Sequence, residues 1–325
     1  MLKQLLNECI IDLIIKTDGP ILIKSGIPTL SGPDMAFVTT RRNGTQEAYL
    51  PGSSLKGTLR SHAERIARTL NSAAACNPFV EANKPEAFCG HIFEERKDKD
   101  LPNREQRDEL NQLIYRDSCP ICRLFGSTWF AGRLATEDAY AVGSAPTPQQ
   151  RDGVGIDRFT GGAAHGVKFD LEVITEAKFA TRLHLRNFEL WQLGLLGFVL
   201  IDLADGLIRI GSAKSRGLGR VRGEIDKVRL DFLGPHAPKP ADGSLKLKGL
   251  GGMVSSKIAE DYDLAYPDEV SIPAQEPAST NGLRTTYRFE GASFPWQQFA
   301  PLWINKAMRY ENPDGMLPFR GGRRR

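Results

Sequence analysis

The sequence lacks a long apolar run. Its longest, near Leu193 to Leu203, is interrupted by Gly197 and Asp202 and is too short to cross a bilayer. The first residues lead into an alternating pattern rather than the apolar core of a signal peptide. We therefore expect a cytoplasmic protein that makes no membrane contact.

The sequence also has few histidines and only a small net charge. The five histidines are scattered, and no Ser/His/Asp or Cys/His nucleophile set can be assembled from them. The net charge of +4 at pH 7 is too small to indicate a nucleic-acid partner by itself. The positions of the basic residues are more informative about a nucleic-acid partner. These residues concentrate in segments 56–68 and 214–222.

What remains is the composition of an ordinary globular protein. The chain has 325 residues, of which 41% are hydrophobic and 25% are charged. This is enough to bury a full core in one elaborated domain or two modest ones.

Alternating patterns predict the strands. Residues 11–15 predict the first strand, and segments 133–142, 179–185 and 221–232 predict three more. The dipeptide Asn43-Gly44 favours a tight hairpin, because both residue types tolerate positive φ.

Two segments with helical periodicity predict helices. Apolar residues from Leu55 to Leu70 recur every three or four positions, and Ser53 or Ser54 is expected to cap this helix. Segment 188–203 supplies a second, strongly apolar helix. The resulting order of strand, helix, strand, strand, helix, strand is that of the ferredoxin-like fold, which RRM modules share.

We therefore expect an α+β protein with a ferredoxin-like (RRM-like) core made by residues 1–70 and 132–233. A cysteine-containing insertion occupies residues 71–131, and the glycine-rich segment 152–175 forms an extended hairpin arm. Residues 234–325 form a linker, rich in Pro, Gly and Lys, and a C-terminal extension.

The stretch Tyr49 to Arg60 (YLPGSSLKGTLR) opens the first predicted helix with glycine and serines. Backbone N–H groups at a helix start, beside the hydroxyls of Ser53 and Ser54, form an anion site, and Lys56 and Arg60 lie one turn apart. Phosphate is the natural ligand of such a site. The alternative is an ordinary capped helix with solvated basic residues.

A second glycine-rich segment, Gly211 to Gly219 (GSAKSRGLG), combines glycines with basic residues. Its candidate contact residues are Lys214, Ser215, Arg216, Gly217 and Gly219. The Gly-Lys-Ser/Thr ending of a P-loop is missing, which disfavours nucleoside triphosphate binding. A plain flexible loop is one alternative. Two glycine-plus-basic loops on one ferredoxin-like unit favour a ligand that is a chain of phosphates.

Four cysteines suggest a metal site. Cys76, Cys89, Cys119 and Cys122 have the spacing C-x12-C and C-x2-C, and the close pair can place two thiolates on one tetrahedral ion. Disulfides are not expected in a reducing cytoplasm. Structural zinc is the preferred interpretation. Replacement of one cysteine ligand by His91, or four unrelated cysteines, are the alternatives.

Four segments together resemble the RAMP superfamily, the repeat-associated proteins of type III CRISPR effector complexes and their type IV relatives. The segments are Tyr49 to Arg60, Cys119 to Gly126 (CPICRLFG), Gly155 to Gly161 (GIDRFTG) and Gly211 to Val221 (GSAKSRGLGRV). They follow the family's order, and their joint match is specific although each alone is weak.

The resemblance implies a crRNA-binding backbone subunit of a CRISPR ribonucleoprotein in antiviral defence. Copies of it would stack into a filament along the guide RNA, present it to target RNA or DNA, and contact other effector subunits. The residues implied to hold guide phosphates are Ser53, Ser54, Lys56, Arg60 and the loop from Lys214 to Gly219. Asp157, Arg158 and Phe159 would lie at the root of an arm that inserts between bases. Several members of the family carry zinc in the insertion.

Asp34 resembles the aspartate with which type III backbone subunits cleave target RNA, by metal-dependent attack of the ribose 2′-hydroxyl. Here Met35 to Val38 replace the proline and second acidic residue of that pattern. A lone carboxylate on a Gly-Pro loop is also a common turn former. Two alternatives to a pure binder therefore stay open: an endoribonuclease that uses Asp34 and Mg²⁺, and a standalone RAMP protein that processes guide-RNA precursors.

Overall fold

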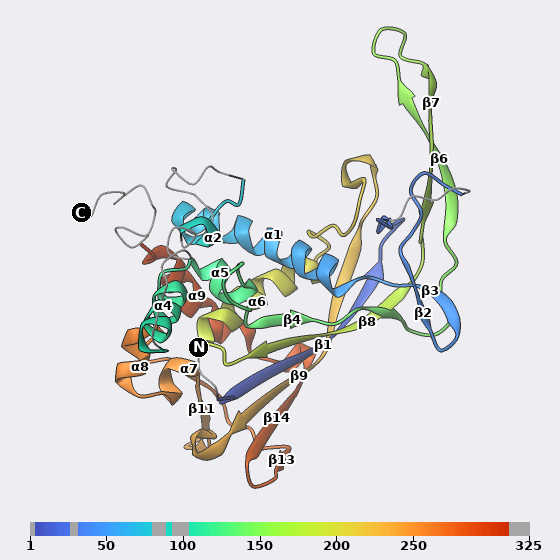
Figure 1. Cartoon of the computed structure of the whole chain (residues 1–325). Helices are drawn as coiled ribbons and strands as arrows, with labels where there is room; N and C mark the ends of the chain where they lie inside the picture. Colours follow the sequence, from blue (N-terminus) through green and yellow to red (C-terminus); the bar gives the residue numbers. More distant parts are fainter. Residues whose placement is uncertain (1–3, 27–31, 80–88, 93–103, 312–325) are drawn as a thin grey trace, which may run out of the picture.

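The computed structural model describes residues 4–26, 32–79, 89–92 and 104–311. It is a mixed α+β protein built on a seven-stranded antiparallel sheet (Figure 1). The strand order is β13-β14-β9-β1-β8-β4, and β5 also pairs with β8. These strands are β1 (Asn7–Thr17), β4 (Leu134–Thr136), β5 (Tyr140–Ala141), β8 (Lys178–Arg186), β9 (Val221–Leu233), β13 (Ser279–Thr280) and β14 (Arg284–Glu290).

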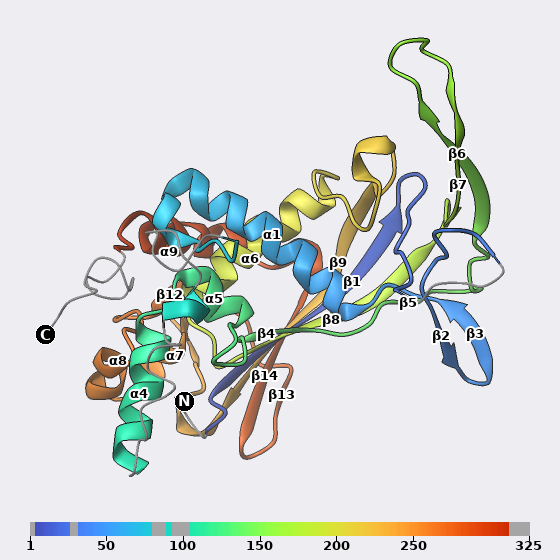
Figure 2. The same ribbon diagram turned by 45° about the horizontal axis from the view of Figure 1, so that its top comes forward.

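The expected ferredoxin-like core is confirmed. In chain order its elements are β1, α1 (Gly52–Leu70), β4, β8, α6 (Leu190–Ala204) and β9. The four core strands lie side by side as β9-β1-β8-β4, which is the fourth, first, third and second in chain order. Both helices cover the same face of the sheet (Figure 2).

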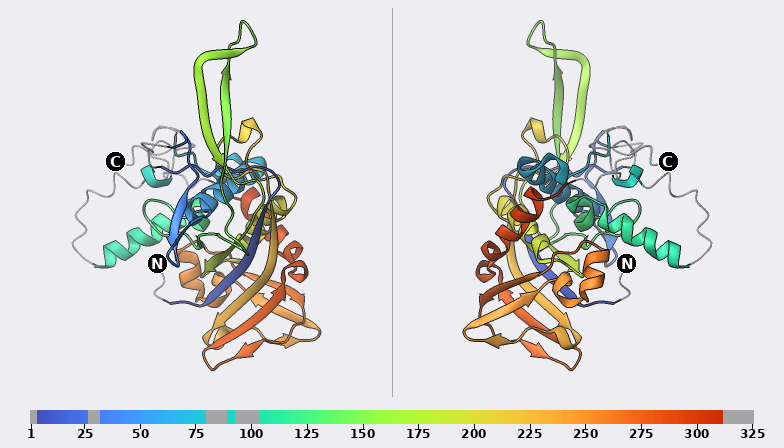
Figure 3. Two further views of the ribbon diagram at one scale, coloured as in Figure 1. Left: turned by 90° about the vertical axis from the view of Figure 1, so that its right-hand side faces the viewer. Right: turned by 90° about the vertical axis from the view of Figure 1, so that its left-hand side faces the viewer.

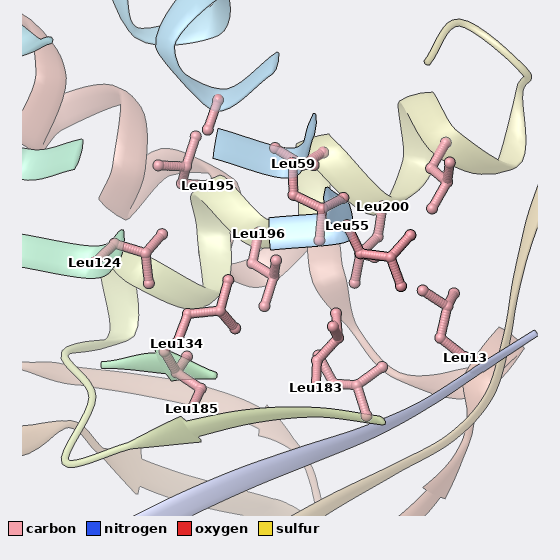
Figure 4. Close-up of a cluster of buried hydrophobic side chains, with 14 of the residues drawn as sticks. Leu13, Leu55, Leu59, Leu124, Leu134, Leu183, Leu185, Leu195, Leu196 and Leu200 are labelled. Carbon is pink, nitrogen blue, oxygen red and sulfur yellow. The ribbon is translucent and has the colours of Figure 1, made fainter. Parts of the chain in front are cut away.

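The hydrophobic core lies between the sheet and these helices. Alternation along β1 buries Ile11, Leu13 and Ile15, as period-2 geometry requires. The leucines that meet between the sheet, α1 and α6 include Leu13, Leu55, Leu59, Leu183 and Leu200 (Figure 4). Burying one such side chain stabilises the fold by roughly 1.5–3 kcal/mol, so this layer fixes where α1 sits.

The C-terminal part adds to the core rather than hanging from it. Strand β14 extends the sheet beside β9, and helix α9 (Trp296–Met308) packs on α6. Gly194 allows the close approach, since a Cβ there would lie 2.3 Å from the carbonyl oxygen of Phe299. No helix within the described residues is long and apolar enough to span a membrane.

The segment that resembles a linker in composition is structured, so that prediction is wrong. Its strands β10 (Pro240–Ala241) and β11 (Ser244–Lys248) form a second sheet with β12 (Glu269–Pro273). Leu245 and Leu247 alternate inward and are fully buried. Two short helices follow β11, α7 (Leu250–Met253) and α8 (Ser256–Asp261).

The cysteine-containing insertion packs between α1 and the C-terminal part. It contributes α2 (Cys89–Ile92), α4 (Arg104–Arg116) and α5 (Pro120–Phe125). Arg123 of α5 is buried, and its guanidinium donates to the carbonyl oxygen of Ser118 at 3.1 Å and to the Asp263 carboxylate at 2.7 Å. This arginine ties the insertion to the loop after α8.

Two hairpins project from the sheet. Strands β2 (Thr39–Arg42) and β3 (Thr45–Ala48) flank Asn43-Gly44, whose φ angles of 49° and 84° confirm the predicted turn. Strands β6 (Gln149–Ile156) and β7 (Ala163–Val173) form the predicted arm, which stands away from the body of the molecule (Figure 3).

Candidate nucleic-acid interface and metal centre

The start of α1 is held by a distant carboxylate. Asp138, in the turn between β4 and β5, accepts a hydrogen bond from the backbone N–H of Gly52 at 2.7 Å. The residue before the helix is Pro51, and no side chain there caps it. The predicted serine cap is therefore wrong, and the hydroxyls of Ser53 and Ser54 are left for other partners.

Small residues line the solvent-facing side of α1. With 3.6 residues per turn, Ser54, Gly57 and Ser61 fall within about 60° of one another around the helix axis. Gly57 and Ser61 are exposed, and a Cβ on Gly57 would meet nothing within 4 Å. We call Ser54, Gly57 and Ser61 the small-residue face; along it, another polymer can approach the helix closely.

Basic residues flank the small-residue face on both sides. Arg60 turns toward α5, where its guanidinium donates to the carbonyl oxygen of Gly126 at 3.0 Å, and Lys56 lies one turn before it. Arg65 lies about 140° from Arg60 around the helix axis, on the other side of the small-residue face. Partial burial and the charge of Arg65 lower the pKa of Lys214, so Lys214 lies within electrostatic range of Arg65. Lys56 and Arg65 thus lie on opposite flanks of α1, and Lys214 is within electrostatic range of the Arg65 flank.

The glycine-rich loop before β9 is fixed rather than flexible. The N–H groups of Ser212 and Gly219 donate to the carbonyl oxygens of Leu22 and Pro20 at 2.8 and 2.9 Å. Gly219 is buried, has a φ of 90°, and leaves no room for a Cβ, which would lie 2.5 Å from the Ile210 carbonyl oxygen. Its role is to shape the loop.

The rest of that loop faces solvent and touches the arm. Lys214, Ser215, Arg216 and Gly217 are exposed. The guanidinium of Arg216 lies 5.3 Å from the ring centre of Phe169 on β7. The loop therefore occupies the space between α1 and the arm, as both views of the ribbon show (Figures 1 and 2).

Asp157, Arg158 and Phe159 lie at the tip of the arm, so the prediction that they form its root is wrong. Asp157 accepts hydrogen bonds from the N–H groups of Phe159 and Thr160, both at 2.8 Å. These bonds lower the pKa of Asp157 and close the turn. Phe159 is presented fully to solvent, and Arg158 is exposed beside it.

Asp34 lies at the root of the arm. Its carboxylate accepts a hydrogen bond from the N–H of Asp170 at 3.1 Å, and the N–H of Met35 donates to the Asp170 carbonyl oxygen at 3.0 Å. Asp34 is exposed. Across the described ranges, the only group of three or more potential metal ligands is the cysteine group, so no such group forms around Asp34.

The four cysteines of the insertion come together. The Sγ atoms of Cys76, Cys89, Cys119 and Cys122 lie within 4.8 Å of one another, and all four residues are buried. Cys76 and Cys122 are 3.5 Å apart, too far for a disulfide. Tetrahedral zinc–thiolate bonds of about 2.3 Å would space the sulfurs by about 3.8 Å. The donor set and its size therefore fit a metal ion; the side chain of His91 lies outside the described part of the chain.

Hydrogen-bond donors surround these sulfurs. The N–H groups of Cys119 and Cys122 donate to the sulfurs of Cys89 and Cys119 at 3.3 and 3.4 Å. Although burial opposes ionisation, hydrogen bonds from the neighbouring cysteines hold the pKa of Cys119 well below its usual value. The same hydrogen bonds raise the pKa of Cys89 and Cys122, so the pocket favours one thiolate shared among thiols, and a bound metal ion would deprotonate the others.

Comparison with known proteins agrees with this arrangement. The family model of the RAMP superfamily matches residues 14–222, which include the start of α1, the paired cysteines, the arm and the loop before β9. The chain belongs to the RAMP superfamily. Membership indicates a CRISPR-associated RNA-binding protein. No curated protein matches this RAMP chain.

Sequence reasoning missed three features of this RAMP protein's site. Asp138 caps α1 from another part of the chain, and nothing local to it signals that role. Gly57 and Ser61 belong to the exposed face of α1 and Arg65 to the flank beside it, and helical spacing from Ser54 could have identified them. The contact of Arg60 with the cysteine group could not be read from sequence, since it joins residues 62 apart.

Proposed function

We propose that this protein is a backbone subunit that grips guide RNA (crRNA) by its sugar-phosphate chain. The observation that carries the proposal is the small-residue face of α1 with cations on both flanks. The strand crosses Ser54, Gly57 and Ser61, while Lys56 reaches its phosphates from one flank and Lys214 from the other.

Small side chains suit this task because a backbone can approach the helix without a clash. Serine hydroxyls offer hydrogen bonds to phosphate and ribose oxygens, and lysines neutralise charge. Contacts of this kind do not read base edges, so binding is independent of sequence. The RNA crosses the small-residue face rather than binding at the helix start, because the Asp138 carboxylate already accepts a hydrogen bond from the first N–H there.

The arm supplies the second part of the proposed grip. Phe159, fully exposed at its tip, stacks on or between bases, as aromatic side chains do in single-strand binding. Arg158 lies beside Phe159 at the tip, and Ser215, Arg216 and Gly217 line the route from the arm to α1. Copies of the chain then stack along one guide RNA, which presents its bases to target RNA or DNA, with other effector subunits at the ends.

Zinc is the ion that we propose for the cysteine group. Four thiolates in a closed, buried site are the ligand set of structural zinc. There it would hold α5 and the segment after α1 together. Its chemistry is structural, since four protein ligands leave no open position for a substrate.

A salt series tests the RNA grip. Purified protein is titrated with two single-stranded RNAs of unrelated sequence, and the logarithm of the affinity is plotted against that of the salt concentration. We expect Lys56→Ala and Lys214→Ala each to weaken both RNAs alike and to reduce the slope by about 0.7, one phosphate contact. Lys257→Ala, an exposed lysine on α8, is the matched control. Wild-type slopes in both lysine variants would refute the assignment.

A further inference from the structure

Arg60 makes three directed contacts on the flank that faces α5. Its Nε donates to Glu64 Oε1 at 3.0 Å, its Nη1 to the carbonyl oxygen of Gly126 at 3.0 Å, and its Nη2 to the Sγ of Cys122 at 3.5 Å. The side chain is only 25% exposed. Burial would lower the pKa of Arg60, but Cys122 and Glu64 more than offset this and raise it. The guanidinium is thus a fixed cation beside the sulfurs.

Lys56, one turn earlier, has different surroundings. No hydrogen bond or ion pair joins its ammonium to another part of the described chain. It lines an open depression of about 370 Å³ together with Arg60, Phe125 and the loop from Gly126 to Gly132. Burial and the charge of Arg60 lower the pKa of Lys56. Of the two basic residues, Lys56 is therefore the one available to an external anion.

The charge of the metal site explains why a cation is needed next to it. Four thiolates and one divalent ion carry a net charge of −2, and burying such a charge without compensation is costly. Backbone N–H groups supply only partial charges. Arg60, which shares its positive charge with the Glu64 carboxylate, supplies a nearby cation and an N–H···S hydrogen bond at the sulfur of Cys122.

We propose that Arg60 is a positioning residue of the metal site, which balances the charge of the thiolates and orients Cys122, and that it is not an RNA contact. This rests on the metal site proposed above. Glu64 holds the guanidinium in place through its carboxylate. The residue joins the helix that carries the RNA grip to the insertion that carries the ion, so the metal steadies the flank of α1 on which Lys56 lies.

Metal affinity is the first test. Wild-type protein and the Arg60→Ala, Arg60→Lys and Arg68→Ala variants are loaded with Zn²⁺ and titrated with a chromophoric chelator. Outer-shell changes cost about 10- to 100-fold in metal affinity, which is the loss expected for Arg60→Ala. Arg60→Lys keeps the charge and loses less. Arg68 is the comparison variant, because it donates to the Cys76 carbonyl oxygen at 2.7 Å and to Glu64 at 3.5 Å but to no sulfur. Arg68→Ala, which removes no hydrogen bond to a sulfur, should lose less metal affinity than Arg60→Ala.

The absorption spectrum of the cobalt-loaded protein separates the loss of a hydrogen bond to sulfur from a general loss of packing. Loaded with Co²⁺, the site shows sulfur-to-cobalt charge transfer, whose energy depends on the hydrogen bonds that the sulfurs accept. Arg60→Ala should shift this band to longer wavelength, whereas Arg68→Ala should leave it in place. An unshifted band, with unchanged chelator titration, would overturn the inference.

RNA binding separates the inference from the proposed function. At saturating Zn²⁺, Arg60→Ala should bind RNA like wild type, whereas Lys56→Ala should lose RNA affinity and keep its metal. Loss of RNA affinity in Arg60→Ala with intact metal binding would make Arg60 an RNA contact and overturn the inference alone. A wild-type protein that binds neither Zn²⁺ nor Co²⁺ would remove the metal site and the inference with it, leaving the RNA grip untouched.

Discussion

Asp138 and Gly52 are 86 residues apart in sequence and are joined by a 2.7 Å hydrogen bond. The bond sets a carboxylate against the positive end of α1, where negative charge is favourable. Glycine is also the only residue type that fits at position 52, because a Cβ there would lie 2.6 Å from the Thr136 carbonyl oxygen. The sheet edge and the helix start are therefore held together, which fixes the position of the small-residue face relative to β4 and β5.

Removing this cap should destabilise the protein. We expect Asp138→Ala to lower the free energy of unfolding by about 1 kcal/mol, the usual value of a helix cap. Ser53→Ala, at one of the two serines predicted from sequence to cap the helix, should change stability by less than about 0.5 kcal/mol. Denaturant unfolding of the two variants measures both. Equal losses would mean that the serine contributes to the cap as well.

The contrast between the helix and its cap shows which parts of the fold are readable from sequence. Residues Leu55 to Leu70 carry a periodic apolar pattern, and every turn of the helix repeats the signal locally. The cap depends on where β4 ends relative to α1, and tertiary contacts decide that. The same holds for residues 240–248, whose polar, Gly- and Pro-rich composition hides the inward alternation of Leu245 and Leu247.

Gly57 offers a test of the small-residue face that separates RNA binding from folding. A Cβ fits without contact, and alanine is the better helix former, so Gly57→Ala should stabilise the protein by about 0.5–1 kcal/mol. Gly57→Glu should also fold, but its side chain and charge would obstruct a nucleic-acid backbone. We expect RNA affinity to fall sharply in the glutamate variant and little in the alanine variant. Unchanged binding by Gly57→Glu would place the RNA elsewhere.

The tip of the arm should contribute through stacking. Phe159 is fully exposed, so Phe159→Ala should leave the unfolding free energy unchanged. Loss of one base–aromatic stack is worth about 1–3 kcal/mol of binding. Phe79→Ala, which removes another exposed phenylalanine (94%), is the control and should bind RNA like wild type. Equal affinity of the two variants in a binding titration would argue against insertion by the arm.

The four cysteines of the metal site could be predicted from sequence, but the residues around them could not. The C-x2-C pair and two further cysteines predict a tetrathiolate set, which the structure brings together. Spacing says nothing about Arg60, because its place beside Cys122 depends on how α5 packs against α1. The resemblance to the family placed Asp157 at the wrong end of the arm, because a motif match does not give the point from which the hairpin projects.

Metal removal should loosen the insertion. A chelator is expected to lower the melting temperature, because the ion ties Cys76 after α1 to Cys119 and Cys122 of the α5 segment. Metal binding keeps each thiol deprotonated, so this stabilisation is present at higher pH and is lost as the pH falls and protons displace the ion. Metal content measured against pH, alongside melting curves, checks the sign. A melting temperature insensitive to both chelator and pH would contradict a structural ion.

Asp34 decides between a binder and an endoribonuclease. Its carboxylate accepts a hydrogen bond from the N–H of Asp170. Within the described chain it does not lie in a group of three or more potential metal ligands, so we do not expect it to hold Mg²⁺ tightly. We therefore expect labelled complementary RNA, added to the assembled complex with Mg²⁺, to stay intact and to bind equally well to the Asp34→Ala complex. The variant matters because Asp34 also anchors the root of the arm, and Asp34→Asn, which keeps an acceptor for Asp170, separates anchoring from catalysis. Regularly spaced products that vanish in both variants would show that the chain cleaves its target through this carboxylate.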